Sequence, residues 1–265
     1  MRGTRLIAVT AALLLAALVA GAATLADSGP SAARIVPSHL QAGPGPLRTA
    51  TGVLAYSDST GLSMTATCAF DFVHGTADIT ANAQLSIATI DVEARLVGAT
   101  LLLNTASLQS LTGSPWVSVP AQRASAGLER LERTLRHPDL AALRKANRAT
   151  VSTTGRTSTT TMWFNHVTLP STSGLPITLP SEGRLVLVVT TGSEGQLLVA
   201  TAHLSNSSED VHFSLHMTGY NQPVEVAVPS SADVVALTPS RARQIFGTNA
   251  PAVLHWLRRA GTTIP

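Results

Sequence analysis

The sequence predicts an α+β protein in which helices lie over an antiparallel β-sheet. Apolar and polar residues alternate along several short runs, and segments rich in Gly, Asn, Ser and Pro separate these runs. A leucine-rich stretch with helical spacing lies between two groups of such runs. About 240 residues beyond the N-terminal segment are compatible with a single large β-rich domain.

The clearest strand pattern lies between Gly183 and Pro229. It predicts an antiparallel meander of four strands: Arg184–Thr191, Gln196–Leu204, Val211–Gly219 and Val224–Val228. A hairpin closed about Ser207-Ser208 puts the bulky side chains of one face opposite small or apolar ones: Phe213 opposite Ala202, Leu215 opposite Ala200, and Met217 opposite Leu198. The other face then carries Thr201, His203, His212, Ser214 and His216. One face is therefore predicted to be polar and the other apolar, with room over its alanines.

The first half of the chain repeats this pattern. The runs Leu62–Val73 and Thr76–Ala83 are expected to turn at His74-Gly75, and the runs Gln84–Leu96 and Ala99–Thr105 at Val97-Gly98. These turns predict the pairs Met64/Leu85, Cys68/Ala81, Phe70/Ile79, Val92/Leu103 and Ala94/Leu101 on shared faces.

The helical stretch lies between the two β blocks. Ser125 is predicted to cap a helix with Leu128, Leu131 and Leu135 on one face, and Pro138 to begin a second helix carrying Leu140 and Leu143. Basic residues outnumber acidic ones over 123–148, which fits either an ordinary solvated helix face or a cationic lid near an anionic bilayer.

The ends of the chain are expected to lie outside the folded domain. Arg2 and Arg5 precede an uncharged Ala- and Leu-rich run, so residues 1–26 are predicted to be a secretory signal peptide or an N-terminal membrane anchor. Residues 27–49 are predicted to be a Pro- and Gly-rich tether, 50–238 the folded domain, and 239–265 a short helical tail. The tail pattern predicts helices over Pro239–Phe246 and Pro251–Ala260, which pack on the domain, cap a sheet edge or dock on a partner. Everything after Asp27 is expected to be extracytoplasmic.

Composition argues against several function classes. Removing residues 1–26 deletes Arg2 and Arg5 and no acid, so the formal charge falls from +3 to +1, and aromatic residues are too scarce for base stacking. Nucleic acid is therefore not an expected partner. The single cysteine, Cys68, allows no intramolecular disulfide and is predicted to be a buried apolar residue.

The polar residues give no catalytic pattern. His203, His212 and His216 lie close on the predicted sheet, but no carboxylate or thiol is fixed beside them by spacing, so neither a metal site nor a cofactor is predicted. Asp71 and Asp78 fall opposite each other on the outer face in this register, where contact would raise one pKa, but separate solvated carboxylates or a slightly different register are the favoured interpretation. No Gly-x-Ser-x-Gly, HExxH or phosphate-loop motif occurs. A hydrolase is therefore only the third candidate function, and an esterase activity screen tests it. Trp116 and Trp163 are expected in the core or at a cavity rim.

A family resemblance rests on the order of several segments. Asn104-Thr105-Ala106, then 113–120 (GSPWVSVP), the helical pair, Gly183-Arg184-Leu185, 219–226 (GYNQPVEV) and 228–235 (VPSSADVV) follow one another. In this order the chain resembles the actinobacterial envelope lipoproteins of the LppX/LprG type, more distant relatives of the LolA and LolB carriers. The resemblance implies a curved antiparallel β half-barrel with helices covering the concave face and a hydrophobic cavity for acyl chains, and no catalytic residue.

The sequence therefore predicts a non-catalytic carrier of the cell envelope, secreted or membrane-tethered, that binds a lipid, glycolipid or lipoprotein. Its expected partners are acyl chains, the membrane surface and a membrane transporter. The residues predicted to line the cavity are Met64, Phe70, Phe72, Val92, Leu101, Leu103, Phe213, Leu215 and Met217. The alternative is a membrane-anchored extracytoplasmic interaction or sensor domain, with a core filled by its own side chains and a protein partner.

Overall fold

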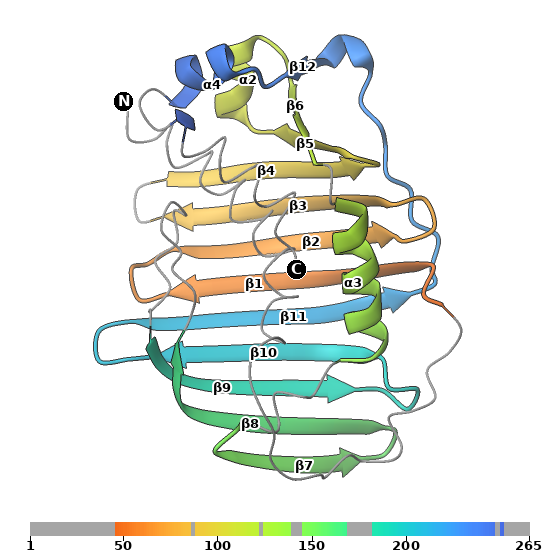
Figure 1. The fold of residues 1–265 in the computed structure, drawn as a ribbon, viewed down its shortest axis with the longest axis vertical. Helices are drawn as coiled ribbons and strands as arrows, with labels where there is room; N and C mark the ends of the chain where they lie inside the picture. The colour runs from red at the N-terminus through yellow and green to blue at the C-terminus, as the bar shows by residue number, and fades with distance from the viewer. Residues whose placement is uncertain are drawn as a thin grey trace.

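The computed structural model describes residues 46–85, 88–121, 124–138, 145–168, 182–246 and 250–251. In these ranges the chain forms one open, mostly antiparallel sheet of 12 strands with few helices (Figure 1). The strand order is β12-β6-β5-β4-β3-β2-β1-β11-β10-β9-β8-β7. Two antiparallel meanders thus lie side by side and join where β1 pairs with β11.

The first meander runs outward from the centre of the sheet to one edge. Short turns connect its first five strands, and a helix separates the last two. The strands are β1 (Thr49–Asp58), β2 (Ser63–Asp71), β3 (Thr76–Leu85), β4 (Ala88–Val97), β5 (Thr100–Asn104) and β6 (Trp116–Pro120).

The second meander runs inward from the opposite edge. Its strands are β7 (Arg148–Thr154), β8 (Thr157–Thr168), β9 (Glu182–Thr191), β10 (Leu197–Ser205) and β11 (Asp210–Tyr220). The chain then returns to the far edge, where β12 (Val234–Ala236) pairs with β6 in parallel. This short pair is the parallel exception in the sheet.

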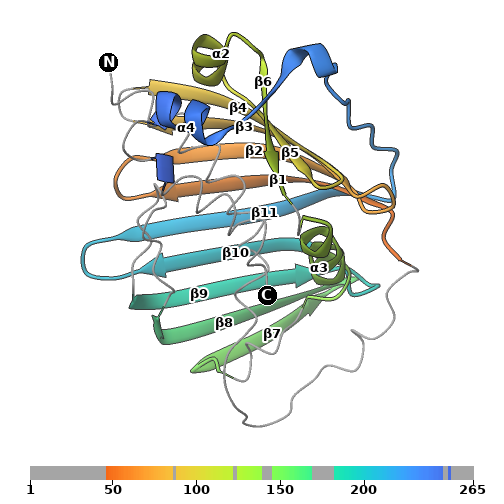
Figure 2. The same cartoon turned by 45° about the horizontal axis from the view of Figure 1, so that its top comes forward.

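Helices occupy two places on the sheet (Figures 1 and 2). Near the β6 edge lie α2 (Ala106–Thr112), the 3-10 helix η3 (Ser231–Asp233) and α4 (Pro239–Phe246). Helix α2 begins because the Thr105 hydroxyl accepts the Leu108 N–H at 3.1 Å, and it ends at Gly113, whose φ of 70° suits a residue without a side chain. Helix α3 (Ala124–Arg136) lies against the sheet beside β10.

Helix α3 binds the sheet through its leucine stripe. Leu128, Leu131 and Leu135 are buried and belong to the same hydrophobic cluster as the sheet residues, which confirms the predicted helix face. The Leu47 N–H donates to Glu132 Oε1 at 3.1 Å and ties the start of the sheet to the helix. Leu47 is itself in the cluster and β1 starts at Thr49. The packed domain therefore includes the last residues of the segment that was predicted to be a tether, 27–49.

The predicted strand Val224–Val228 is wrong, because residues 221–230 have no regular secondary structure. Strand β11 lies between β1 and β10, so both of its edges are already occupied and no fourth strand can extend the meander. The segment instead runs past the strand ends toward β12, and Arg95 Nη1 donates to the Ala227 carbonyl at 2.8 Å (Figure 1).

The two predicted hairpins of the first half are right in their faces and wrong in register by two residues. Cys68 lies opposite Ile79 and Phe70 opposite Ala77, and Met64 pairs with Ala83. Strand β2 stops at Asp71 because the Asp71 carboxylate accepts the N–H groups of Val73 and His74 at 3.0 Å each and folds 72–75 into a turn.

The next hairpin shifts for a related reason. Ala94 lies opposite Leu103 and Leu96 opposite Leu101, because Gly98 takes the first position of a two-residue loop with a φ of 57°. The predicted run Gln84–Leu96 is also not one strand, since β3 continues to Leu85 and β4 begins at Ala88. A shift of two preserves the face of every side chain, so the apolar pattern survived the register error.

Further predictions concern the C-terminal hairpin, the helices and the ends of the chain. The C-terminal hairpin is confirmed, with Ala202 opposite Phe213 and Ala200 opposite Leu215, but the pairing of β10 with β11 begins at Val199 and His216 and does not include the predicted pair Met217–Leu198. The helix Pro239–Phe246 is confirmed, and α3 begins at Ala124 rather than after a cap at Ser125. Several elements were not predicted from the sequence: β1, β6, β7, β8, β12 and α2. Three predicted segments lie mainly or entirely outside the described residues: the signal or anchor segment, the helix after Pro138 and the helix Pro251–Ala260.

Candidate functional site

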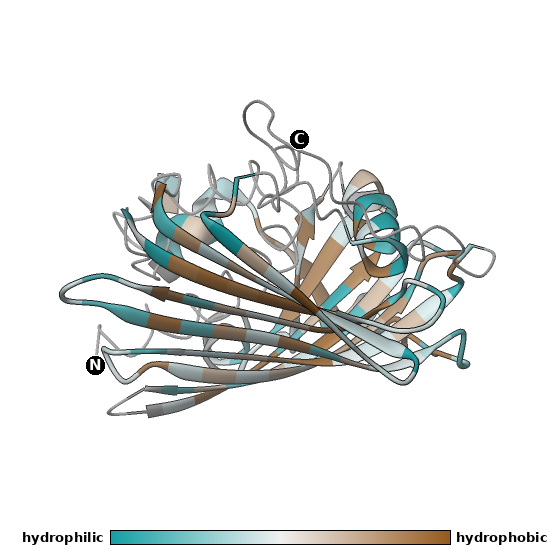
Figure 3. Cartoon of the chain, turned by 90° about the horizontal axis from the view of Figure 1, so that it is seen from below, coloured by the Kyte–Doolittle hydropathy of each residue, from teal (hydrophilic) through white to brown (hydrophobic). Residues whose placement is uncertain are grey.

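The largest feature of the sheet is one continuous apolar face. A row of directly paired residues crosses seven strands, from β4 to β9: Val92, Ala81, Ala66, Leu54, Leu215, Ala200 and Val189. A second row runs beside it and reaches β8: Ile90, Ala83, Met64, Tyr56, Phe213, Ala202, Leu187 and Met162. We call this surface the apolar face. Figure 3 shows the alternation of hydropathy along the strands that produces it.

Bulky and small side chains alternate across these rows. Ala202 lies between Phe213 and Leu187, and Ala200 lies between Leu215 and Val189. The predicted pairing of bulky side chains with alanines is therefore confirmed for these two pairs on β10 and β11.

Burial differs along the apolar face. On β2, β3 and β4 the side chains of the two rows are buried, and Ala83 and Val92 are completely inaccessible. On β9, β10 and β11 several are only partly buried although they contact the same cluster: Leu187, Ala200, Ala202, Phe213 and Met217. We call these five residues the half-buried patch. Leu96 and Leu101, which pair between β4 and β5, are also partly buried against the cluster.

All the residues predicted to line a cavity lie in this one hydrophobic cluster. Met64, Phe70, Val92, Leu103 and Leu215 are buried within it. Phe72, Leu101, Phe213 and Met217 are partly buried against it, and the rings of Phe70 and Phe72 stack with centroids 6.1 Å apart. The prediction therefore gathered residues that lie together, but only Phe213 and Met217 belong to the half-buried patch. Ala200, Ala202 and Leu187 were missed as lining residues.

Two tyrosines on this side of the sheet have satisfied hydroxyls. Tyr56 Oη donates to Asp58 Oδ2 at 3.0 Å, and Tyr220 Oη donates to the Leu197 carbonyl. Burial, together with the nearby Asp58 carboxylate, raises the pKa of Tyr56, and burial raises the pKa of Tyr220. Both phenols therefore stay neutral at physiological pH and add no charge to the apolar face.

Cys68 is a packing residue, as predicted. It is 5% exposed, and burial raises the pKa of its thiol to about 12. A thiol that keeps its proton is a poor nucleophile. Cys68 therefore supports no covalent chemistry on this face.

The tryptophans lie on the other face of the sheet. Trp116 is 7% exposed beneath the Arg95 guanidinium, whose carbon lies 4.5 Å from the ring centroid. Trp163 is partly buried, with Arg148 at 5.1 Å. Trp116 is thus a buried residue, as favoured from the sequence, and both rings bind a cation.

Asp71 and Asp78 do not lie opposite each other, so the favoured alternative of a different register is confirmed. Asp71 pairs with Thr76 and Asp78 with Ala69, because β2 ends two residues earlier than expected. Asp78 instead lies 3.6 Å from Arg95. Burial acts to raise the pKa of Asp71, but hydrogen bonds from His74 and Val73 outweigh it, so the pKa is lowered rather than raised.

The face opposite the apolar face carries the predicted polar residues. We call it the histidine face, because His203, His212 and His216 lie on it. A hollow of about 500 Å³ lies mainly on this face, over β2, β1, β11, β10 and β9. Its lining includes Ser57, Thr201, His203, His212 and Ser214.

The structure brings one unpredicted residue to the histidines. Asp210 Oδ1 lies 2.5 Å from His203 Nε2 and 3.3 Å from His212 Nε2. The expectation that no carboxylate stands beside the histidines is therefore wrong. The signal was present in the sequence, since Asp210 precedes His212 by two residues and so shares its face of the strand.

No model of a known protein family matches this chain, and no curated protein matches it significantly. Among the residues that the structure describes, the helices are too short or too polar to span a bilayer.

Proposed function

We propose that this protein is a non-catalytic carrier of the cell envelope that binds a lipid, glycolipid or lipoprotein by burying acyl chains against the apolar face. The observation that carries the proposal is the half-buried patch, where apolar side chains and alanines on neighbouring strands remain partly accessible beside buried ones. A soluble domain has little reason to keep such a surface open unless something else covers it.

The energetics favour an acyl chain as the occupant. Each methylene removed from water contributes about 0.8 kcal/mol before ordering costs are subtracted. A chain lying across β9, β10 and β11 would meet Leu187, Ala202 and Phe213 in succession along one paired row. The alanine in the middle of this row provides the depth that a linear chain needs.

Helix α3 is proposed to serve as part of the cover of the binding face. Its leucines already join the cluster of the apolar face, and it lies next to β10, within the region that stays partly open. A curved sheet with α3 over its inner side would form the half-barrel expected from the resemblance. The Leu47–Glu132 hydrogen bond would then hold one end of the cover in place.

The proposed setting is extracytoplasmic. Residues 1–26 have the charge and hydropathy pattern of a secretory signal or membrane anchor. A carrier in this place would exchange its cargo with the membrane surface and with a membrane transporter. Its work would be transfer rather than chemistry.

A second function, an extracytoplasmic interaction or sensor domain, is favoured by two observations. Large side chains of the protein itself are fully buried in the core: Met64, Leu135, Met162, Val92 and Val117. In addition, every residue of the edge strand β7 is exposed, including Val151 at 46%, and an exposed edge is able to pair with a strand of another protein.

Native mass spectrometry separates the two functions. The full-length chain, produced in an actinobacterial host, is analysed under native conditions, and its bound molecules are extracted into organic solvent. The carrier function predicts a discrete lipid mass bound to the protein. A clean ligand-free mass, together with failure to take up a fluorescent lipid, would favour the interaction domain.

A further inference from the structure

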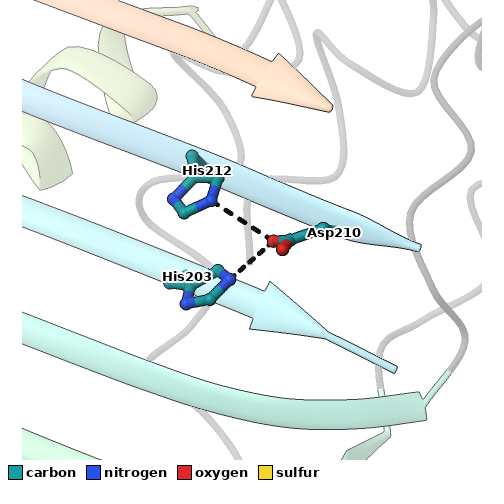
Figure 4. Close-up of side chains that lie close together, drawn as sticks. All are labelled: His203, Asp210 and His212. Carbon is teal, nitrogen blue, oxygen red and sulfur yellow. Dashed lines mark hydrogen bonds and ion pairs between the residues drawn. The ribbon is translucent and has the colours of Figure 1, made fainter. Parts of the chain in front are cut away.

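The histidine face holds a cluster with the composition of a metal site. His203 lies on β10, and Asp210 and His212 lie on β11, directly beside it (Figure 4). The ligand atoms of all three lie within 4.8 Å of one another. Two imidazole nitrogens and a carboxylate oxygen form a donor set that suits borderline divalent ions such as Zn²⁺ better than it suits Ca²⁺ or Mg²⁺.

The sheet fixes the positions of these side chains. His203 and His212 are directly paired residues of an antiparallel ladder, and their rings stack 4.1 Å apart at an angle of 8°. Strands β10 and β11 are interior strands, flanked by β9 and β1. Asp210 is also held by its backbone, because its N–H donates to Ser59 Oγ at 3.2 Å and its carbonyl accepts the Ser59 N–H at 2.9 Å.

Both histidines direct Nε2 to the same oxygen of Asp210 (Figure 4). Three donors that converge on one point on rigid strands lose little freedom when an ion joins them. A metal ion at this point would be bound by the two Nε2 atoms and by the Asp210 carboxylate.

The cluster also borders open space. His203 and His212 line the hollow of about 500 Å³ on the histidine face, and the side chains are 40% and 59% exposed. Ser57, which pairs with His212 across β1, lines the same hollow. A three-ligand site beside such a hollow leaves a coordination position for water or an anion.

We propose that His203, Asp210 and His212 form a binding site for a borderline divalent metal ion, with Zn²⁺ as the best-fitting ion. The site lies on the face of the sheet opposite the apolar face, so it is independent of lipid binding. It would give the protein a metal-dependent surface whichever of the two proposed functions is correct.

Isothermal titration of the full-length protein with ZnCl₂ at pH 7.5 tests the proposal. We expect saturable binding of one ion per chain. Titration with MgCl₂ or CaCl₂ is expected to show no saturable binding.

The variants His203→Ala, Asp210→Asn and His212→Ala should each lower the Zn²⁺ affinity about tenfold or more. His216→Ala is the matched control, because His216 is exposed on the same face of β11 but lies outside the cluster. Thermal unfolding without metal checks that each variant is folded, and His203→Gln replaces His203→Ala if the latter is not. The proposal is overturned by a wild-type protein that shows no saturable Zn²⁺ binding, or by a folded His203 variant that binds as tightly as His216→Ala.

Discussion

At the scale of single residues, Asp71 shows how one side chain sets the geometry of its surroundings. Its Oδ1 accepts two backbone N–H groups, and its Oδ2 lies 2.7 Å from His74 Nδ1. These contacts end β2 and turn the chain into β3. They also favour the ionised carboxylate enough to lower its pKa despite its burial.

Asp71→Asn should change the acid dependence of stability. A carboxyl whose pKa is lower in the folded state than its ordinary 3.8 stabilises the fold above pH 3.8, and this contribution is lost as the pH falls through the folded-state value. Asparagine keeps an acceptor for the turn but has no such titration. Urea unfolding between pH 2.5 and 6 should therefore show a shallower loss of stability below pH 4 in the variant. An acid limb identical to that of the wild type would contradict this assignment.

At the scale of elements, helix α3 packs on the sheet through its three leucines. Leu131 is 6% exposed in the middle of the stripe, and Arg133 is exposed on the solvent side of the same helix. The helix therefore offers a buried and an exposed position that can be compared directly.

Leu131→Ala should destabilise the protein by about 2–5 kcal/mol, because it removes buried methyl groups and leaves a cavity. Arg133→Ala should change stability by less than about 0.5 kcal/mol. Chemical denaturation monitored by circular dichroism measures both. Equal, small effects in the two variants would show that α3 does not pack on the sheet through its leucines.

The elements also show what could be predicted from the sequence and what could not. Alternation has a period of two, so it identified the face of Cys68 or Ala94 correctly even where the partner was wrong. The register depended on the Asp71 turn and on Gly98, which shift the pairing by two residues without changing the face. Strands β7 and β8 were missed because Thr and Ser dominate them, and polar β-branched residues give weak hydropathic alternation.

The candidate sites follow the same division. Phe213 and Met217 were found because they are large and alternate. Ala202 and Ala200 were correctly placed opposite Phe213 and Leu215 but were not counted as lining residues because their side chains are small. Leu187 joins the patch through the pairing of β9 with β10. Asp210 was missed although the predicted hairpin already placed His203 beside His212, because the predicted strand began at Val211 and left Asp210 in the turn, whereas β11 begins at Asp210. Contacts between strands are the information that one sequence conveys least directly.

At the scale of the whole molecule, the sheet separates two surfaces with different chemistry. The apolar face is continuous from β4 to β9 and stays partly accessible over β9–β11. The histidine face carries hydroxyl and imidazole groups around its hollow. Because adjacent residues of one strand point to opposite faces, neighbouring positions on β10 can test the two surfaces separately.

The pair Ala202→Leu and Thr201→Leu tests the central claim most directly. Both add apolar volume to the same strand, but Ala202 lies in the half-buried patch and Thr201 lies on the histidine face. Binding of a fluorescent fatty-acyl probe is measured for the full-length wild type and both variants, with thermal unfolding to confirm that each is folded. The account predicts that Ala202→Leu lowers the affinity for the probe about tenfold or more, which corresponds to about 1.4 kcal/mol of lost acyl contact. It predicts that Thr201→Leu binds the probe like the wild type. Equal affinity in the two folded variants, or no probe binding by the wild type, would contradict the account.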